Sequence, residues 1–208
     1  MTIYQRVRGS KVIGFIRRLF KIEIRTPENE PEKAGFIICA NHSSLWDPII
    51  MGATLKNPIK YMAKAELFKI PLLKQLITAF GAFPVNRKSN DLSSIKNTIK
   101  ILEGGDNVGI YPQGHRVRYV NPSSSPIKSG AAMIAYRAKC GILPVTIYTK
   151  KMKVKLFRKT VVIIHPYVPY EELDIGNGNH EAFRRASEYV FRVICAPYNE
   201  QEKIDENA

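Results

Sequence analysis

The chain has 208 residues, of which 45% are hydrophobic and 24% are charged, a composition that argues against disorder. A chain of this length is expected to form one domain, residues 1–208, with a proper hydrophobic core. Lysine and arginine outnumber aspartate and glutamate by 32 to 18, a formal net charge of +14. This excess predicts an anionic partner, which is a nucleic acid, a phosphorylated small molecule or an acidic lipid surface.

Cysteine usage and hydropathy predict the compartment of the protein and its relation to a membrane. The cysteines are odd in number and lie in apolar or helical contexts: Cys39, Cys140 and Cys195. We therefore predict a reducing cytoplasm, without disulfides or a cysteine-based metal site. No window of about eighteen apolar residues occurs, so no membrane-spanning helix is expected. The N-terminus also lacks the pattern of a signal peptide. If the protein meets a membrane, we expect it to lie on the surface.

Residues 1–21 combine apolar and basic side chains. The apolar residues between Ile3 and Phe20 are flanked by Arg and Lys, which is the composition of an amphipathic helix that lies on a membrane. Each basic residue near an anionic leaflet contributes about 1 kcal/mol to such binding. An amphipathic helix packed on its own domain fits the pattern equally well. Residues 200–208 are polar and predict a loose tail.

A short apolar run ends in two titratable side chains. Phe36–Ala40 predicts a buried strand that delivers Asn41 and His42 to the carboxyl edge of a sheet, where open α/β folds bind ligands. Asp47 stands before Pro48, which predicts that Asp47 is the N-cap of a helix with proline at its first position.

His42 and Asp47 meet only if the segment between them folds back, because a spacing of five on a continuous helix separates side chains by about 140°. In a folded-back turn, the carboxylate binds one imidazole nitrogen, fixes the tautomer and leaves the other nitrogen as a base. The alternative is that Asp47 only caps the helix and that His42 is a hydrogen-bonded turn residue. Taken alone, the two residues favour this plainer alternative.

Strand and helix patterns alternate along the chain. After Phe36–Ala40 and the helix that starts near Pro48, we predict strands at 59–64, 82–85, 107–111, 142–148 and 160–164, and helices at 71–80, 91–102, 129–139 and 180–196. This alternation predicts an α/β fold, with a mostly parallel central sheet and helices on both faces. Right-handed crossovers place the loops that follow the strands on one edge. Those loops carry His42, Asp47, Arg87, Gln113, His115 and Arg116.

Two arginines follow predicted strands in the same way. Arg87 and Arg116 each offer a planar guanidinium suited to phosphate, although either one alone is more often a solvated surface residue. Gly114 would let the backbone approach a ligand. Together they predict a phosphate clamp beside a His–Asp base, which suits an acceptor held by its phosphate and activated at a nearby hydroxyl.

Other chemistries lack their motifs. There is no G-x-S-x-G elbow, so Ser43 and Ser44 are poor candidates for a hydrolase nucleophile, and the usual nucleotide-binding glycine motifs are absent. The histidines show no metal-ligand spacing, and we expect His165 and His180 to be structural. A basic nucleic-acid-binding module is the alternative from another class, although the sequence shows no motif for it.

Four blocks in order resemble the lysophosphatidic acid acyltransferases, also called 1-acyl-sn-glycerol-3-phosphate acyltransferases, within the wider glycerolipid acyltransferases. Asn41–Asp47 matches the N-H-x-x-x-x-D block of that family, and Gly81–Arg87 resembles its G-x-F-x-x-x-R block. Tyr111–Arg116, which reads Y-P-Q-G-H-R, is similar to the third block, usually F-P-E-G-T-R, and Leu143–Val145 is similar to the fourth. The resemblance covers residues 20–165, most of the chain.

The resemblance implies a fold of the glycerolipid-acyltransferase type and a role for each block. His42 is then the general base and Asp47 its orienting partner. The phosphate of the acceptor is held by Arg87, Gln113, Gly114 and Arg116, and the candidate acyl-pocket residues are Leu143, Pro144 and Val145.

The same resemblance implies the reaction and its setting. A fatty acyl group would pass directly from acyl-CoA or acyl-carrier protein to the hydroxyl of a lysophospholipid, 1-acyl-sn-glycerol-3-phosphate, giving phosphatidic acid. No bound cofactor or metal is implied. The protein would be peripheral, on the cytoplasmic face of the cell membrane and against its anionic surface.

Two residues of the third block depart from the family pattern. Gln113 stands where the family usually has Glu, and His115 stands where it has Thr. A neutral amide keeps the capacity to hydrogen-bond but removes a negative charge beside the phosphate, so another lysophospholipid or hydroxyl acceptor is an alternative. His115 either adds a donor to the phosphate or fills the turn.

Overall fold

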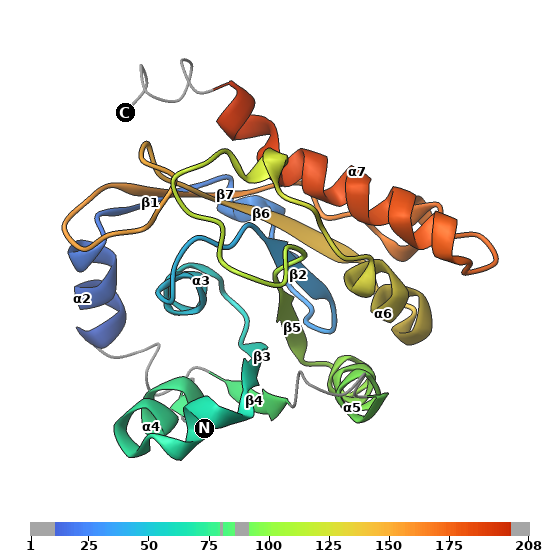
Figure 1. The fold of residues 1–208 in the computed structure, drawn as a ribbon, viewed down its shortest axis with the longest axis horizontal. Coiled ribbons are helices and arrows are strands. Elements are labelled where there is room, and N and C mark those ends of the chain that lie inside the picture. Colours follow the sequence, from blue (N-terminus) through green and yellow to red (C-terminus); the bar gives the residue numbers. More distant parts are fainter. Residues whose placement is uncertain (1–10, 80, 86–91, 201–208) are drawn as a thin grey trace.

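One seven-stranded sheet organises the part of the chain described by the computed structural model, residues 11–79, 81–85 and 92–200 (Figure 1). The strand order is β1-β7-β6-β2-β5-β3-β4, and each neighbouring pair is parallel except β6 and β7. The predicted mostly parallel sheet is therefore confirmed. The strands are β1 Ile22–Arg25, β2 Ile37–Ala40, β3 Ile59–Lys64, β4 Ala82–Val85, β5 Asn107–Ile110, β6 Ile142–Tyr148 and β7 Thr160–Ile164.

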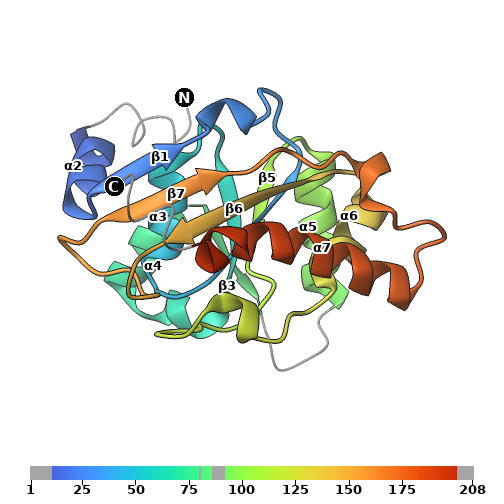
Figure 2. The same ribbon diagram turned by 90° about the horizontal axis from the view of Figure 1, so that it is seen from above.

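Helices cover both faces of the sheet, as predicted. Figures 1 and 2 show α2 and α3 on one face, and α6 and α7 on the other, with α7 lying along β6. The α-helices are α2 Lys11–Leu19, α3 Asp47–Thr54, α4 Pro71–Ala79, α5 Leu92–Glu103, α6 Gly130–Ala138 and α7 His180–Asn199. Short 3-10 turns occupy Pro27–Asn29, Ala65–Lys69, Pro122–Ser124 and Tyr170–Leu173.

β2 divides the hydrophobic core between the two faces. Because successive side chains of a strand point to opposite faces, Ile38 packs in the core under α3, whereas Ile37 and Cys39 pack in the core under α6 and α7. All three side chains are fully or almost fully buried. This explains why the strand that leads to His42 is apolar throughout.

The three thiols are part of the same interior. Cys39, Cys140 and Cys195 are buried, and burial raises the pKa of Cys140 and of Cys195 to about 12. Each thiol therefore stays protonated at neutral pH and packs as a small apolar group.

Two features of the sheet were not predicted. β1 was missed because its sequence, Ile-Glu-Ile-Arg, is short and half-buried, and among the described strands it pairs only with β7, at the edge. The alternation of strands and helices also ends at β6. No helix follows it, so β7 returns antiparallel, since a parallel partner needs a longer crossover.

Part of the predicted amphipathic segment at residues 1–21 forms α2. Ile13 and Ile16 are buried in the core beside α3, and Arg17 Nε donates a 2.8 Å hydrogen bond to the carbonyl of Ala53. For Lys11–Leu19, the helix therefore packs on its own domain, and membrane binding by the segment stays a prediction. Residues 1–10, and residues 201–208 of the predicted tail, lie outside the described residues. In the described part of the chain, every helix is too short or too polar to cross a membrane.

Candidate active site

The first and third blocks meet at the carboxyl edge of the sheet. β2 lies between β5 and β6, so the loop that follows β2 and the loop that follows β5 leave the sheet side by side. This places Asn41–Asp47 against Tyr111–Arg116, as the parallel sheet predicts. Arg87, the arginine of the second block, lies outside the described residues, so its place beside them stays a prediction.

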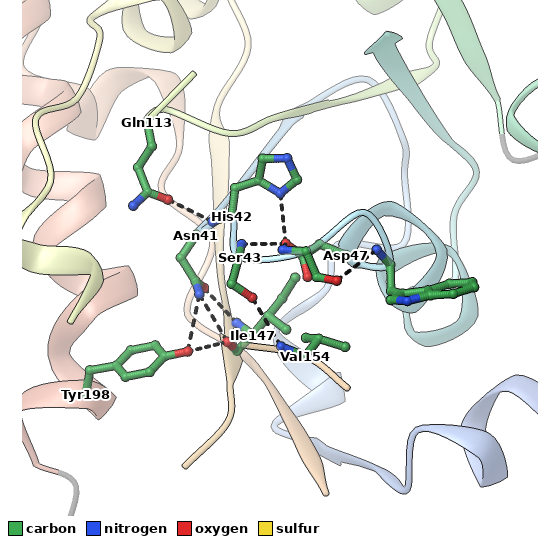
Figure 3. A network of polar contacts seen from close by, with 10 residues as sticks. Asn41, His42, Ser43, Asp47, Gln113, Ile147, Val154 and Tyr198 are labelled. Carbon is green, nitrogen blue, oxygen red and sulfur yellow. Dashed lines mark hydrogen bonds and ion pairs between the residues drawn. The ribbon is translucent and has the colours of Figure 1, made fainter. Parts of the chain in front are cut away.

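His42 and Asp47 form the hydrogen-bonded pair that the folded-back turn requires. His42 Nδ1 lies 2.8 Å from Asp47 Oδ2, and the same oxygen accepts the backbone N–H groups of Ser43 at 2.7 Å and Ser44 at 2.8 Å (Figure 3). The two serine amides bend the chain around the carboxylate. The Asp47 side chain is fully buried, whereas 17% of the His42 side chain is exposed. The turn thus buries the acid and presents the imidazole.

The predicted N-cap role of Asp47 is wrong. Asp47 is the first residue of α3, and the capping position belongs to Trp46, whose side chain makes no capping hydrogen bond. The carboxylate turns back to three donors that precede the helix, instead of binding the amides of its first turn. A negative charge at this end still interacts favourably with the helix dipole, so Asp47 serves the turn and the helix together. Pro48 is the second residue of α3, one position later than predicted.

This geometry assigns the two imidazole nitrogens different roles. With Nδ1–H donating to the carboxylate, Nε2 carries the lone pair, and Figure 3 shows this nitrogen turned away from Asp47. The His42 ring stacks on Tyr111, with ring centroids 4.2 Å apart and planes inclined by 17°. Burial, followed by Tyr61 and the Asp47 carboxylate, holds the pKa of Tyr111 well above its usual range, so this phenol stays neutral. Tyr111 therefore fixes the plane of the His42 ring as a neutral partner.

Gln113 holds the backbone of His42. Its Oε1 accepts the His42 N–H at 2.8 Å, and four residues later Val117 N donates to the His42 carbonyl at 2.8 Å. Gln113 is 2% exposed, and its Nε2 has no hydrogen-bond partner in the described part of the chain. The side chain thus points inward to the Asn41–Asp47 turn. An oxygen acceptor is what this contact needs, and both glutamine and glutamate provide one.

Asn41 fixes the turn to β6, a role that the sequence alone did not show. Its amide exchanges two hydrogen bonds with the backbone of Ile147, at 3.0 Å to the carbonyl and 2.8 Å from the N–H. Tyr198 of α7 donates to the same carbonyl at 2.6 Å (Figure 3). The Asn41 side chain therefore extends the ladder between β2 and β6 by one position, directly before His42. The only sequence signal for this role of Asn41 is an asparagine at the end of an apolar strand.

The outer part of the third block is exposed and basic. Gly114 has a φ of 70°, a conformation that glycine adopts without strain, and His115 and Arg116 are exposed beyond it. Lys128, which was not predicted, lies against this glycine. Its backbone N–H donates to the Pro112 carbonyl at 2.9 Å, and a Cβ added to Gly114 would lie 3.5 Å from its Nζ. The loop thus presents two cations, Lys128 and Arg116, near the His42 turn.

The fourth block lies beneath the site. Leu143 and Val145 are fully buried in the core that α3 covers, and Pro144 pairs with Cys39 in the sheet. Their acyl-pocket role stays a prediction, since a chain that reached them would have to part α3 from the sheet.

The remaining histidines are accounted for by their surroundings. His165 Nε2 lies 2.7 Å from Thr146 Oγ1, and burial lowers the pKa of this histidine to about 4, so it stays neutral in the fold. His180 is the exposed first residue of α7. Within the described ranges, no group of three His, Cys, Asp or Glu side chains gathers to hold a metal ion.

Known proteins share this sequence pattern. Residues 21–148 match the family profile "Acyltransferase". The chain is 36% identical over 139 residues to the 1-acyl-sn-glycerol-3-phosphate acyltransferase of Bacillus subtilis (strain 168), covering 66% of this chain and 68% of that protein. It is 34% identical over 159 residues to the enzyme of the same name from Streptococcus pneumoniae, covering 75% of this chain and 58% of that protein.

A solved structure shares the fold. The crystal structure of the 1-acyl-sn-glycerophosphate (LPA) acyltransferase PlsC from Thermotoga maritima superposes with a TM-score of 0.70 at 24% identity, covering 97% of this chain and 84% of that chain. The family profile includes the His42–Asp47 turn, the third block and the fourth block in one stretch. The fold, the profile and the relatives agree that this chain belongs to the acyltransferase family.

Proposed function

We propose that this protein transfers a fatty acyl group from an acyl thioester to the free hydroxyl of 1-acyl-sn-glycerol-3-phosphate, forming phosphatidic acid. The observation that carries the proposal is the His42–Asp47 pair, with Nδ1 held at 2.8 Å by a buried carboxylate and Nε2 facing away from it. The names of the relatives supply the substrate class.

In the proposed mechanism, His42 acts as the general base. Its Nε2 takes the proton of the acceptor hydroxyl while the hydroxyl oxygen attacks the thioester carbonyl. The tetrahedral intermediate collapses, the C–S bond breaks, and the imidazolium returns the proton to the leaving thiolate. Asp47 stabilises the imidazolium in between. The products are the ester and a free thiol, and no covalent acyl-enzyme is formed.

We propose that Lys128 and Arg116 bind the phosphate of the acceptor. Arg116 directly precedes Val117, whose N–H holds the carbonyl of His42, and Lys128 lies over Gly114 of the same loop. Both side chains are exposed, so the phosphate of an acceptor can reach them. Arg87 is a further candidate of the same site. Gln113 supports this site from within, since its amide oxygen holds the His42 backbone.

We expect Lys128→Ala to raise the KM for the phosphorylated acceptor by about ten- to hundredfold, because a hydrogen bond to a charged group contributes about 1.5–3 kcal/mol. The value of kcat should change little, since the ammonium lies away from the reacting atoms. Steady-state kinetics at varied acceptor concentration measure both constants. Lys128→Arg, which keeps the charge, should restore most of the affinity, and Lys100→Ala on α5 is the matched control. An unchanged KM in Lys128→Ala would remove this residue from the phosphate site.

An acceptor screen with the purified protein tests the function itself. Release of free thiol from acyl-CoA and from acyl-carrier protein should require an acceptor, and 1-acyl-sn-glycerol-3-phosphate should be the best one. Its dephosphorylated analogue, a monoacylglycerol, should be poor because the phosphate contacts are lost. Preference for another lysophospholipid would support the alternative acceptor. The acyltransferase reaction would then stand, but its acceptor would differ from the one proposed. Absence of transfer with every acceptor would contradict the acyltransferase proposal.

We further propose that the protein works as a peripheral protein at the cytoplasmic face of the membrane, since its acceptor resides in lipid. The +14 net charge supports an anionic surface as the partner. The two thioester donors are distinguished by the same screen. No bound cofactor or metal takes part in the proposed steps.

A further inference from the structure

We infer that the loop between β6 and β7, residues 150–159, docks on an anionic lipid bilayer and holds His42 at the membrane surface. The inference rests on the proposed function, because only a lipid acceptor requires the site to face a membrane. It assigns the attachment to a surface beside the catalytic turn, and not to the N-terminal segment alone.

The charge of this loop fits an anionic surface. Six of its ten residues are basic and none is acidic: Lys150, Lys151, Lys153, Lys155, Arg158 and Lys159. Lys151 and Arg158 are exposed, and neither makes a hydrogen bond or ion pair with the described part of the chain. Such a run attracts anionic lipid head groups. Its positive charge complements the negative surface of a cytoplasmic leaflet.

Large apolar side chains project from the same surface. Phe157 is 68% exposed and Leu156 is 40% exposed, and the neighbouring segment adds Tyr119 at 56% and Val120 at 49%. The two segments are joined, since Tyr119 N donates to the Met152 carbonyl at 3.2 Å and Lys153 Nζ to the Tyr119 hydroxyl at 2.8 Å. Exposed aromatic and aliphatic side chains among lysines are typical of a surface that enters the lipid head-group region. The apolar part favours a bilayer over a nucleic acid as the partner.

The backbone is strained at three residues of these two segments. Tyr119, Met152 and Phe157 have φ values of 63°, 52° and 60°, in the left-handed region that bulky residues rarely adopt. Phe157 is fixed in this conformation by its N–H, which donates to the Leu19 carbonyl of α2 at 2.7 Å. Strain of this kind concentrates at functional sites, and here it coincides with the exposed ring of Phe157.

The loop is continuous with the catalytic turn. Val154 is buried, and its N–H reaches Ser43 Oγ at 3.4 Å, next to the amide that holds Asp47 (Figure 3). On the other side, Phe20 at the end of α2 contacts the Trp46 ring, with centroids 5.4 Å apart. Figures 1 and 2 show the loop, in orange, beside α2. Leu45, 64% exposed, and Trp46, 38% exposed, extend the apolar surface to His42. A membrane under this loop therefore lies next to the base.

Flotation of the full chain with vesicles tests the inference. Vesicles of phosphatidylcholine with phosphatidylglycerol should bind the wild-type protein, and vesicles of phosphatidylcholine alone should bind it less. Lys151→Glu/Arg158→Glu should lower the partition coefficient for anionic vesicles by about 25-fold or more, because each basic residue contributes roughly fivefold. Leu156→Ser/Phe157→Ser should also lower it, and the binding that remains should be more sensitive to salt.

The matched control carries the same change of charge at the other edge of the sheet. Lys100 and Arg137 are exposed in the last turns of α5 and α6, which lead into the amino ends of β5 and β6. Lys100→Glu/Arg137→Glu should bind vesicles nearly as the wild type does. Equal losses in the two charge variants, or wild-type binding by the loop variants, would overturn the inference, as would binding of duplex DNA without binding of anionic vesicles. Flotation measures vesicle binding without any substrate. A negative flotation result therefore contradicts the docking surface alone, whereas a negative acceptor screen contradicts the proposed activity.

Discussion

His42→Ala is expected to lower the rate of thioester-dependent acyl transfer by about 10²- to 10⁴-fold, because general-base catalysis contributes that much. Among the described residues, the imidazole is the only titratable side chain that hydrogen-bonds to Asp47, and its Nε2 faces away from that carboxylate. Alanine leaves no group at this place that can take the proton of the acceptor. Free-thiol release with the acceptor in excess measures the loss in kcat.

The His42→Ala protein should remain folded. The contacts that fix this part of the turn are made by the His42 backbone, whose N–H and carbonyl pair with Gln113 and Val117. A thermal unfolding curve and a circular dichroism spectrum check this point. His180→Ala, which removes an exposed imidazole at the start of α7, is the matched control and should keep wild-type activity. A folded His42→Ala protein with full activity would refute the assignment of the base.

Asp47→Asn is expected to lower kcat by about 10²-fold while it leaves the turn in place. Asp47 Oδ2 accepts three hydrogen bonds, from His42 Nδ1 and from the amides of Ser43 and Ser44. An asparagine NH2 group at that point would meet three donors, so the amide oxygen must occupy it. The imidazole then keeps its tautomer and orientation but loses the negative charge that stabilises the imidazolium.

Asp47→Ala separates this electrostatic role from the structural one. It leaves buried donors at Ser43 and Ser44 without an acceptor, which costs on the order of 3 kcal/mol of folding stability. We therefore expect the melting temperature to fall further in Asp47→Ala than in Asp47→Asn, with activity low in both. Wild-type kcat in a folded Asp47→Asn protein would show that the charge does not assist the base.

The outline of the fold follows from local patterns. Mostly apolar runs predicted β2, β5 and β6, because strands buried on both faces favour apolar residues. β1 escaped prediction since its half-buried, partly charged sequence carries no such signal. The antiparallel return of β7 depends on a connection without a helix, which is a property of the topology and not of either strand.

The Asn41–Asp47 turn shows where local reasoning ends. The spacing of His42 and Asp47, and the proline that follows, correctly indicated a strand-to-helix turn. The N-cap prediction failed because the carboxylate has better donors behind it: one imidazole and two amides. Capping propensity predicts that the carboxylate accepts hydrogen bonds from amides of the first helical turn. In the folded turn, other donors lie at hydrogen-bonding distance from Asp47 Oδ2.

By itself, the sequence determined which residues stand at the ends of buried strands, and therefore that His42, Asp47 and the third block share one edge of a parallel sheet. Only the tertiary structure decided how they are held. Gln113 binds the His42 amide across 71 positions of the chain, Asn41 binds Ile147 across 106, and Val154 reaches Ser43 across 111. The physical reason is that periodicity reports the burial of one element at a time, whereas a hydrogen bond between distant loops depends on how several elements pack together. Lys128 and the loop at 150–159 owe their places beside the active site to that packing.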